Sequence, residues 1–430
     1  MNNVKLGDVA DIVTGPFGSM LHKDDYAETG TPVIMPQDIG DRTLSLASIA
    51  HVGSKDAERL ARYATISGDI VYARRGDIEK HAFITEIEAG ALCGTGCLRV
   101  RVDRQKADPL YISFALNGPF NRAWIRLHAV GSNMPNINTD ILSSLPLELP
   151  SLEEQKSVAA LLSAIDDKIA LNKKTMVELE DTARLIYDYW FTQFDFPDEN
   201  GRPYRSSGGK MVYNETLKRE IPEGWEAVSV NELVHVEKGI SYKANDLKGE
   251  GVPMVNLASF NTGGTYKAEG LKSYSGAIDS RKTVLPLDLV MCITQQTAID
   301  LSGKTNVIGK TFFVPDIFDN TVVISTDVCK LMVGNEAYAY VLNGLFKRSD
   351  IHKYIVGFAN GTKIKHLDTS AAFNLRFAVP PNGSDVLGCY SVKARLFEKE
   401  KSNLLRENLC LGVLRDWLLP MLMNGQVHVD

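Results

Sequence analysis

The sequence predicts an α+β fold in which a globular segment followed by a long helix occurs twice. Two observations lead to this prediction: heptad patterns of apolar residues in two stretches, and a second half that repeats the patterns of the first. The chain has 430 residues, 44% of them hydrophobic, which is sufficient for two to four domains. The expected parts are a first repeat at 1–150, a helix at 151–192, a linker at 193–225, a second repeat at 226–382, a helix at 383–424 and a tail at 425–430.

The two repeats share short sequence patterns in the same order along the chain. Each pattern combines alternating apolar residues with glycine turns, which is typical of short strands mixed with a few helices. The aligned segments are 4–15 with 228–239, 32–39 with 253–260, 67–75 with 286–294, 112–120 with 338–346, and 131–150 with 361–380.

The stretch 151–192 predicts one long helix. From Val158 to Trp190, alternating steps of four and three residues meet an apolar residue everywhere except at Asn172. A repeat of 3.5 residues puts these side chains on one stripe, which needs a partner helix. The stretch has no glycine or proline to break the helix. A single polar residue in such a seam typically sets the register, so we place Asn172 in a seam between two helices.

The stretch 383–424 is the expected partner. Apolar residues recur every seven positions from Tyr390 to Leu418. Both stretches end in similar residues, and we place Trp190 and Trp417 in the helix seam. The predicted arrangement is a long antiparallel two-helix coiled coil that separates the two repeats, with pseudo-twofold symmetry. The alternative is two unrelated amphipathic helices packed on separate domains. The polar residues that share the second seam are Lys401, Asn408 and Arg415.

Composition and charge restrict the possible functions. The chain carries 47 Lys and Arg against 53 Asp and Glu, a net charge of −6, so a nucleic-acid site must be a local basic surface. The six cysteines show neither a disulfide ladder nor zinc spacing, which predicts buried free thiols and no metal site. No signal peptide or membrane span is apparent, and we expect a cytoplasmic protein. The stretch 193–225 is rich in Pro, Gly, Ser and charge, as linkers are.

One catalytic motif nearly appears at 298–305, where Gly303, Lys304 and Thr305 resemble the end of a phosphate-binding loop. Such a loop needs a helix directly after it, whereas the residues that follow are β-branched and aromatic. A basic hairpin loop with Lys304 and Lys310 is the better interpretation. No dinucleotide-binding or adenine-methyltransferase motif occurs, and no catalytic residue is predicted. An enzyme that binds ATP at this loop stays open as an alternative.

Polar and basic residues follow corresponding segments of the two repeats, and they are candidate contacts with nucleic acid. Arg can read guanine and Gln can read adenine in the major groove, each with two hydrogen bonds. Lys, Ser and Thr suit phosphate oxygens, and Asn suits a base edge. For each residue the alternative is a solvated loop or a salt bridge. The candidates are Arg74, Arg75, Lys80 and His81 around the end of the 67–75 segment, Gln295 and Gln296 after 286–294, Ser132, Asn133 and Asn136 after Gly131, Thr362, Lys363 and Lys365 after Gly361, and Lys304 and Lys310.

With this repeat and these helices, the chain resembles the specificity subunits of Type I restriction–modification systems. The resemblance extends over essentially the whole chain. Its most specific segments are LPLELPSLEEQKSVAALLSAIDDKIALNKK at 145–174, YWFTQFDF at 189–196 and IPEGWE at 221–226.

The resemblance implies a non-catalytic, sequence-specific DNA-binding subunit with two target-recognition domains, each reading one half of a bipartite double-stranded DNA site. It implies two DNA methyltransferase subunits docked at the helices and a recruited restriction and translocase subunit. S-adenosylmethionine, ATP and Mg would be bound by those partners, with no cofactor in this chain. Glu154 and Gln155 would contact a partner subunit, and the second helix lacks their counterpart. The alternative is a coiled-coil adaptor that presents two protein-binding modules without DNA recognition.

Overall fold

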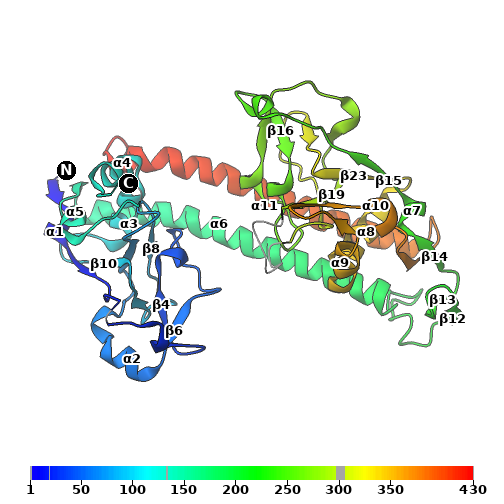
Figure 1. Cartoon of the computed structure of the whole chain (residues 1–430), viewed down its shortest axis with the longest axis horizontal. Coiled ribbons are helices and arrows are strands. Elements are labelled where there is room, and N and C mark those ends of the chain that lie inside the picture. Colours follow the sequence, from blue (N-terminus) through cyan, green and yellow to red (C-terminus); the bar gives the residue numbers. More distant parts are fainter. Residues whose placement is uncertain (1, 19, 132–133, 297–305, 430) are drawn as a thin grey trace. The chain divides into compact units, whose positions relative to one another are not determined.

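The computed structural model describes residues 2–18, 20–131, 134–296 and 306–429. The chain divides into two compact units. Unit 1 consists of Met1–Ile169 together with Cys410–Asp430, and unit 2 consists of Ala170–Leu409. Both units mix helices and strands (Figure 1), in agreement with the predicted α+β class.

Unit 1 is built around three β-sheets within its described residues. Its strands are β1 (Asn2–Lys5), β2 (Ala10–Thr14), β3 (Tyr26–Ala27), β4 (Thr31–Ile34), β5 (Asp41–Arg42), β6 (Ala50–Val52), β7 (Ile70–Ala73), β8 (His81–Phe83), β9 (Leu92–Cys93), β10 (Cys97–Val102) and β11 (Pro146–Leu149). The sheet orders are β2-β10-β7-β8-β5, β3-β6-β4-β9 and β1-β11. Neighbouring strands are antiparallel except β4 with β9 and β5 with β8, which are parallel.

Unit 2 has counterparts of the three sheets of unit 1, and it has two further small sheets. Its strands are β12 (Met211–Asn214), β13 (Arg219–Pro222), β14 (Glu226–Ser229), β15 (Val234–Lys238), β16 (Val252–Val255), β17 (Lys272–Tyr274), β18 (Thr283–Val284), β19 (Leu289–Cys292), β20 (Thr294–Gln296), β21 (Thr311–Phe313), β22 (Val322–Ile324), β23 (Val328–Val333), β24 (Ala359–Asn360), β25 (Ile364–Leu367) and β26 (Arg376–Val379). The sheet orders are β15-β23-β19-β21, β17-β16-β22-β18, β14-β26, β20-β25-β24 and β12-β13.

Short helices cover the sheets in corresponding places of the two units. Those of unit 1 are α1 (Leu6–Val9), α2 (Ser54–Arg59), α3 (Pro109–Asn117), α4 (Pro119–His128) and α5 (Thr139–Ser143); those of unit 2 are α7 (Val230–Leu233), α8 (Glu336–Lys347), α9 (Ser349–Val356) and α10 (Thr369–Ala372). α3 and α8 begin at side-chain caps: Asp108 accepts from the Tyr111 amide, and Asn335 from the Ala337 amide, both at 2.9 Å. Such caps satisfy amides that a helix start leaves unpaired.

The strand registers confirm the internal repeat. In unit 1, β1 and β11 pair with Asn2 opposite Leu149, and in unit 2 β14 and β26 pair with Glu226 opposite Val379. These are the positions that the sequence repeat aligns with each other. The parallel pairs β4–β9 and β16–β22 agree in the same way. The two halves therefore share strand pairing residue by residue, although their side chains differ.

The predicted linker 193–225 packs against unit 2 and contains strands of its own. Phe194, Phe196 and Trp225 are buried in the core of unit 2. The Phe196 ring stacks on Trp225 with centroids 5.3 Å apart and on Tyr204 at 4.6 Å. The strands β12 and β13 also lie within this segment. Its few aromatic residues bury enough apolar surface to hold it against the unit.

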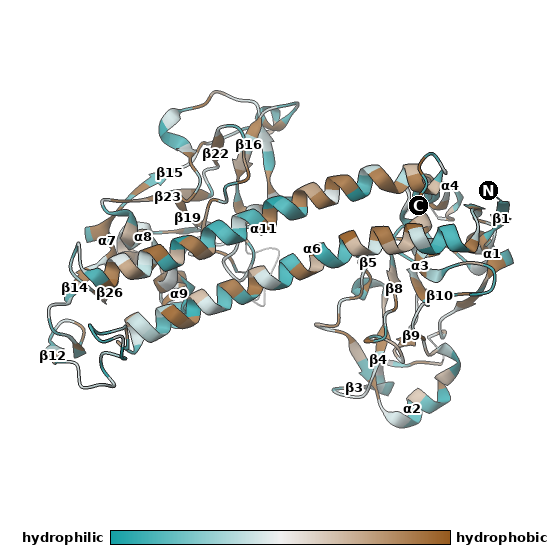
Figure 2. Cartoon of the chain, turned by 180° about the vertical axis from the view of Figure 1, so that it is seen from behind, coloured by the Kyte–Doolittle hydropathy of each residue, from teal (hydrophilic) through white to brown (hydrophobic). Residues whose placement is uncertain are grey.

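Two long helices pass through both units. α6 (Leu152–Tyr187) has 36 residues and continues into a π-helical turn at Asp188–Thr192. α11 (Asp385–Met423) has 39 residues. These bounds match the predicted stretches 151–192 and 383–424 within two residues at the ends. Figure 2 shows apolar and polar residues interspersed along both helices, as the heptad patterns require.

The two helices pair antiparallel within each unit, as predicted. Along each unit, the residue number on α11 falls as that on α6 rises. The polar residues of the second seam, which weakened the sequence pattern, each meet a polar partner on α6, so no charge is left alone between the helices. The pairs are Arg415 with Asp166 at 2.9 Å in unit 1, and Asn408 with Asn172 at 2.9 Å and Lys401 with Glu180 at 2.6 Å in unit 2.

The seam predictions for the two tryptophans have different outcomes. Trp190 is buried, and its ring lies 5.8 Å from that of Tyr390 on α11. Trp417 is 55% exposed, so its placement in the seam is wrong. The adjacent face of α11 carries Leu419 and Leu422, which are buried in the core of unit 1. Because a helix turns 100° per residue, burying these leucines directs Trp417 outward.

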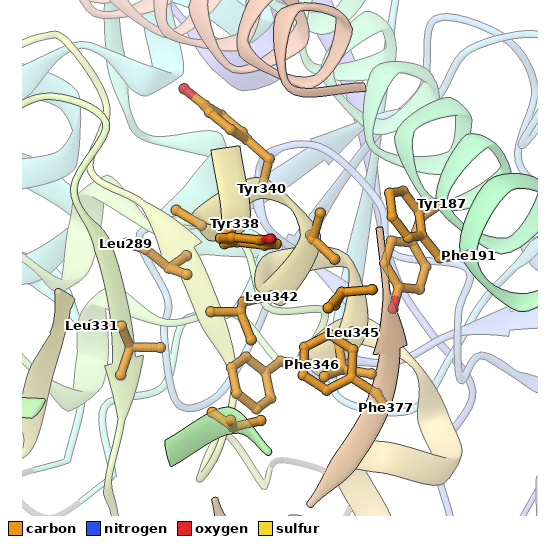
Figure 3. Close-up of a cluster of buried hydrophobic side chains, with 14 of the residues drawn as sticks. Tyr187, Phe191, Leu289, Leu331, Tyr338, Tyr340, Leu342, Leu345, Phe346 and Phe377 are labelled. Carbon is orange, nitrogen blue, oxygen red and sulfur yellow. The ribbon is translucent and has the colours of Figure 1, made fainter. Parts of the chain in front are cut away.

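Each unit has its own apolar core. In unit 2 the close-up in Figure 3 shows Leu342 and Phe346 of α8 on the side of the sheet residues Leu289 and Leu331, while Leu345 lies near Phe377. In unit 1 the α3 residues pack on the five-stranded sheet in the same manner. Four cysteines lie buried as free thiols, as predicted, whereas Cys389 and Cys410 on α11 are exposed.

Asn172 lies in the helix seam, as predicted. Its side chain is 2% exposed, and its amide donates hydrogen bonds to Glu407 (2.7 Å) and Asn408 (2.9 Å). We expect Asn172→Leu to keep or raise the melting temperature, because an apolar side chain suits a seam position and the exposed Glu407 can turn to water. Thermal denaturation checks this expectation. A loss above about 2 kcal/mol would mean that the hydrogen bonds to α11 outweigh the gain in packing.

Candidate functional site

In unit 1 three of the predicted contact residues, Arg74, Arg75 and Asn136, meet beside the end of β7. Arg74 and Arg75 follow directly after β7, and the backbone of Arg75 forms an isolated antiparallel bridge with Asn136. The Arg74 Nε donates to the Asn136 Oδ1 at 3.2 Å. Asn136 also exchanges two backbone hydrogen bonds of 2.9 Å with Val130, which closes the hairpin. Arg75 is exposed, and its guanidinium has no ion-pair partner among the described residues.

Glycine makes both hairpin turns possible. Gly131 has φ +105°, and a Cβ there would lie 2.8 Å from the carbonyl oxygen of Met134. Gly361 has φ +131°, and a Cβ there would lie 2.0 Å from the carbonyl oxygen of Ile364. At both positions, the φ angle and the close approach disfavour any residue other than glycine. Thr362 and Lys363, which follow Gly361, are therefore held in a tight turn at the surface.

In unit 2 the candidates extend a strand. β20 pairs with β25 so that Gln295 lies opposite Lys365 and Gln296 opposite Ile364. The Gln295 Oε1 accepts a hydrogen bond from the Val307 amide at 2.9 Å. Gln296 is exposed, which leaves its amide available to a ligand. Here too, residues some 70 positions apart in the sequence are brought to one strand pair.

The strand register shows that Gln295 and Gln296 are not the counterparts of Arg75 in unit 2. The bridge of Arg75 with Asn136 has its equivalent in the pairing of Thr294 with His366, at the positions that the repeat aligns. Gln295 and Gln296 therefore lie beyond the counterpart of Arg75. In unit 2 the strand continues for two residues past this position, whereas in unit 1 the pairing ends there. The two units therefore present different surfaces on the same backbone scaffold.

Several other candidates are less accessible than predicted. Lys80 is 40% exposed and forms an ion pair with Asp77 at 2.7 Å. His81 is fully buried, and its Nε2 lies 3.0 Å from the Ser113 Oγ, so it is a core residue and no surface contact. Burial lowers the pKa of His81 to about 3, which keeps it neutral. Lys310 is half-buried rather than in an exposed loop, and burial lowers its pKa, with Lys347 adding to the effect.

The remaining candidates divide into two groups. Thr362 and Lys363 are exposed on the turn after Gly361. Ser132, Asn133 and Lys304 lie outside the described residues.

The predicted partner contact at the start of α6 needs correction. Gln155 is 1% exposed, its Oε1 accepts from the Asp108 amide at 2.9 Å, and its Nε2 donates to the Pro150 carbonyl at 3.0 Å. It therefore joins α6 to the start of α3 inside unit 1 and has no free group for a partner subunit. Glu154 faces outward and lies 2.5 Å from the ring of His428 in the C-terminal tail.

Residues that sequence reasoning missed lie beside Gln295 and Gln296. A surface groove of about 550 Å³ is lined there by Tyr242, Lys267 and Lys272, among others. No sequence pattern marks these three residues, because they are far apart along the chain and fall outside the aligned segments. Only the strand pairing brings them to one place.

Neither a metal site nor a membrane helix is found in the described parts of the chain. No group of three His, Cys, Asp or Glu side chains there could hold a metal ion. None of the helices that the structure describes is long and apolar enough to cross a membrane.

Residues 1–181 match the family model described as "Type I restriction modification DNA specificity domain". Over these residues the chain is similar to the DNA specificity domain of type I systems. The match ends inside α6, but the equivalent strand registers of unit 2 show that the same domain fold recurs in the second half. Both units of the chain are thus built on one scaffold.

Two relatives of the chain are named as type I specificity subunits. The Type I restriction enzyme MjaIX specificity subunit of Methanocaldococcus jannaschii is 26% identical over 308 residues, which cover 70% of this chain and 65% of that protein. The chain therefore spans just under two thirds of this relative. The HindI specificity subunit of Haemophilus influenzae is 22% identical over 429 residues, covering 87% of this chain and 89% of that protein.

A solved structure shares the fold. The crystal structure of the type I restriction–modification S subunit from M. genitalium has a TM-score of 0.56 and 15% identity, covering 98% of this chain and 95% of that one. At 15% identity, this likeness shows a shared fold and nothing more.

Proposed function

We propose that this chain is the DNA-recognition subunit of a type I restriction–modification complex, and that each unit binds one half of a bipartite double-stranded DNA target. One observation carries the proposal. Both units hold a glycine-turned hairpin against a strand end at equivalent registers, through Arg75 with Asn136 in unit 1 and Thr294 with His366 in unit 2. In unit 2, Gln296 and Lys365 lie close to this pair on the same two strands. One scaffold with divergent surface residues suits the recognition of two different half-sites.

The side chains at the two hairpins have suitable chemistry. Arg75 can donate two hydrogen bonds to the O6 and N7 of guanine, and Gln296 can bond the N6 and N7 of adenine. Lys363 and Lys365 can bind phosphates, which position a protein on DNA without reading sequence. The chain has a net charge of −6, so this binding depends on a local cationic surface within an acidic protein.

The long helices are proposed to dock two methyltransferase subunits and to form one antiparallel coiled coil with pseudo-twofold symmetry between two target-recognition domains. Several apolar side chains on both helices are 55% to 72% exposed, and a partner that covered them would bury apolar surface. They are Leu171, Val177 and Leu185 on α6, and Val392, Leu396, Val413 and Trp417 on α11.

In this proposal the chain itself is non-catalytic. S-adenosylmethionine, ATP and Mg are bound by the methyltransferase and the restriction and translocase subunits. The whole complex acts in the cytoplasm, where its DNA substrate lies.

DNA binding tests the proposal directly. The full chain, alone and co-purified with its methyltransferase subunits, should bind duplex DNA with an affinity that falls steeply as salt increases, because bound phosphates release counterions. A coiled-coil adaptor without DNA recognition would show no duplex binding in either form. That result would overturn the proposal.

Single substitutions at the hairpins should change base preference. We expect Arg75→Ala and Gln296→Ala each to relax discrimination at one base position by about 1–3 kcal/mol. The measurement is selection of bound sequences from a random duplex pool by the assembled complex. Arg202→Ala is the control, because Arg202 is exposed and paired with Asp198 away from the hairpins. Unchanged preference at every position in both hairpin variants would exclude these residues from base readout.

A further inference from the structure

The groove beside Gln295 and Gln296 in unit 2 has a volume of about 550 Å³, and its lining combines apolar residues with a few charged and amide side chains. Its cationic residues are Lys267 and Lys272, against one acid, Asp327. Excess positive charge in a concave surface favours an anionic ligand. The groove thus continues the candidate interface beyond the two glutamines.

Lys272 is held in a defined position within this groove. It lies on β17, opposite Met254 of β16, and its side chain is half-buried. Its Nζ donates a hydrogen bond to the Tyr242 Oη at 3.1 Å and lies 5.3 Å from the centre of the Tyr242 ring. An ammonium group has three donor hydrogens, so two remain for a ligand. Because the tyrosine fixes the lysine in advance, less side-chain entropy is lost on binding.

At the two aligned positions, the described part of unit 1 has no equivalent of this pair. Val33 of β4, the counterpart of Met254, lies opposite Ala50, where unit 2 has Lys272. Tyr242 lies three residues after Gly239, and three residues after the aligned Gly15 the chain has Gly18. The hydroxyl and the ammonium are therefore specific to unit 2, although the backbone around them is shared.

We propose that Lys272, positioned by Tyr242, binds a DNA backbone phosphate next to the base that Gln296 reads, and that unit 2 alone has this contact. The inference rests on the proposed DNA-recognition function and names a phosphate site within it. Tyr242 acts as a positioning residue, since its hydroxyl accepts from the lysine. The phosphate contact explains why a lysine with a fixed geometry stands beside an exposed glutamine.

The test measures the salt dependence of binding to random-sequence duplexes, with the full chain co-purified with its methyltransferase subunits. Loss of one phosphate contact on B-DNA lowers the slope of log K against log salt by about 0.9, which corresponds to about eightfold weaker binding at 0.1 M salt. We expect this change for Lys272→Ala, while Lys272→Arg keeps the wild-type slope. Tyr242→Phe should keep the slope and weaken binding by less than Lys272→Ala.

Lys218→Ala is the matched control, because Lys218 is exposed on the β12–β13 hairpin and paired with Glu215 at 3.0 Å. It should leave the slope unchanged. A wild-type slope for Lys272→Ala, in a protein that melts like the wild type, overturns the inference and leaves the proposed function standing. If Lys272→Ala is misfolded, a lowered slope in the folded Lys272→Arg variant overturns it instead. If the wild-type chain itself binds no duplex, the proposed function fails.

Discussion

Glu180→Ala is expected to lower the free energy of unfolding of unit 2 by about 3–5 kcal/mol, because it leaves buried lysines without their partner. The Glu180 carboxylate accepts hydrogen bonds from Lys347 of α8 and from Lys401 of α11, the latter at 2.6 Å. Lys401 also donates to Glu398 at 2.7 Å. The side chains of all four residues are between 11% and 17% exposed. Chemical denaturation of the purified chain measures the loss.

Glu178→Ala is the matched control for this variant. Glu178 lies one half-turn away on the same helix, is 65% exposed and lies 3.8 Å from Lys174. An exposed ion pair of this kind contributes about 0–1 kcal/mol. Equal losses for Glu178→Ala and Glu180→Ala would show that the buried cluster does not stabilise the attachment of α6 to α8 and α11.

The same cluster implies a dependence of stability on pH. Burial alone would raise the pKa of Glu180, but Lys347 and Lys401 lower it from 4.5 to about 2. A carboxylate whose pKa is lower in the folded chain stabilises the fold above its unfolded pKa. The stabilisation should be complete above pH 4.5 and be lost as the pH falls toward 2. The stability difference between wild type and Glu180→Ala should therefore shrink over this acidic range.

Exchange of residues 1–150 for the same segment of a family member with another target should change one half of the methylated DNA site and leave the other half unchanged. Each unit has a separate core and a separate candidate hairpin. The ends of the exchanged segment lie together, because Asn2 pairs with Leu149. Gln155 bonds only backbone groups of the segment, which any replacement also provides. Sequencing of methylated sites in cells that contain the assembled complex measures the outcome.

The reciprocal exchange of residues 226–382 is the control, since Glu226 pairs with Val379 in the same way. It should change the other half-site. A change of both half-sites on exchanging one segment, or a single continuous target, would contradict the model of two independent readers.

The long helices could be predicted because their information is local and periodic. Apolar residues at a spacing of 3.5 define a stripe whatever the partner is. The pattern could not show that Lys401 and Arg415 would be neutralised by Glu180 and Asp166, since these pairs lie more than 200 residues apart. Nor could the pattern predict which way Trp417 points. Near the end of α11 the periodicity allows either of two neighbouring helix faces to be buried, and the leucines buried in unit 1 decide which one is.

The candidate contact residues were predictable in part. The repeat and the glycines located Arg75, Asn136, Gln296 and Lys365, because a turn with positive φ is a local property of the chain. The sequence could not predict whether Gln155 is buried or exposed. A glutamine at this position of an amphipathic helix can either face solvent or be buried. Its burial depends on the backbone of a distant helix start and a strand end, which only the folded unit brings to it.

The sequence by itself determined the internal repeat, the extent of the two long helices, the polar seam position at Asn172 and the resemblance to specificity subunits. These features follow from local spacing and from the order of short patterns along the chain. Only the tertiary structure decided which distant side chains meet, as Gln295 and Lys365 do across β20 and β25 and as Tyr242 does with Lys272. The reason is physical: strand register sets which residues lie opposite each other, and register depends on cores assembled from the whole unit.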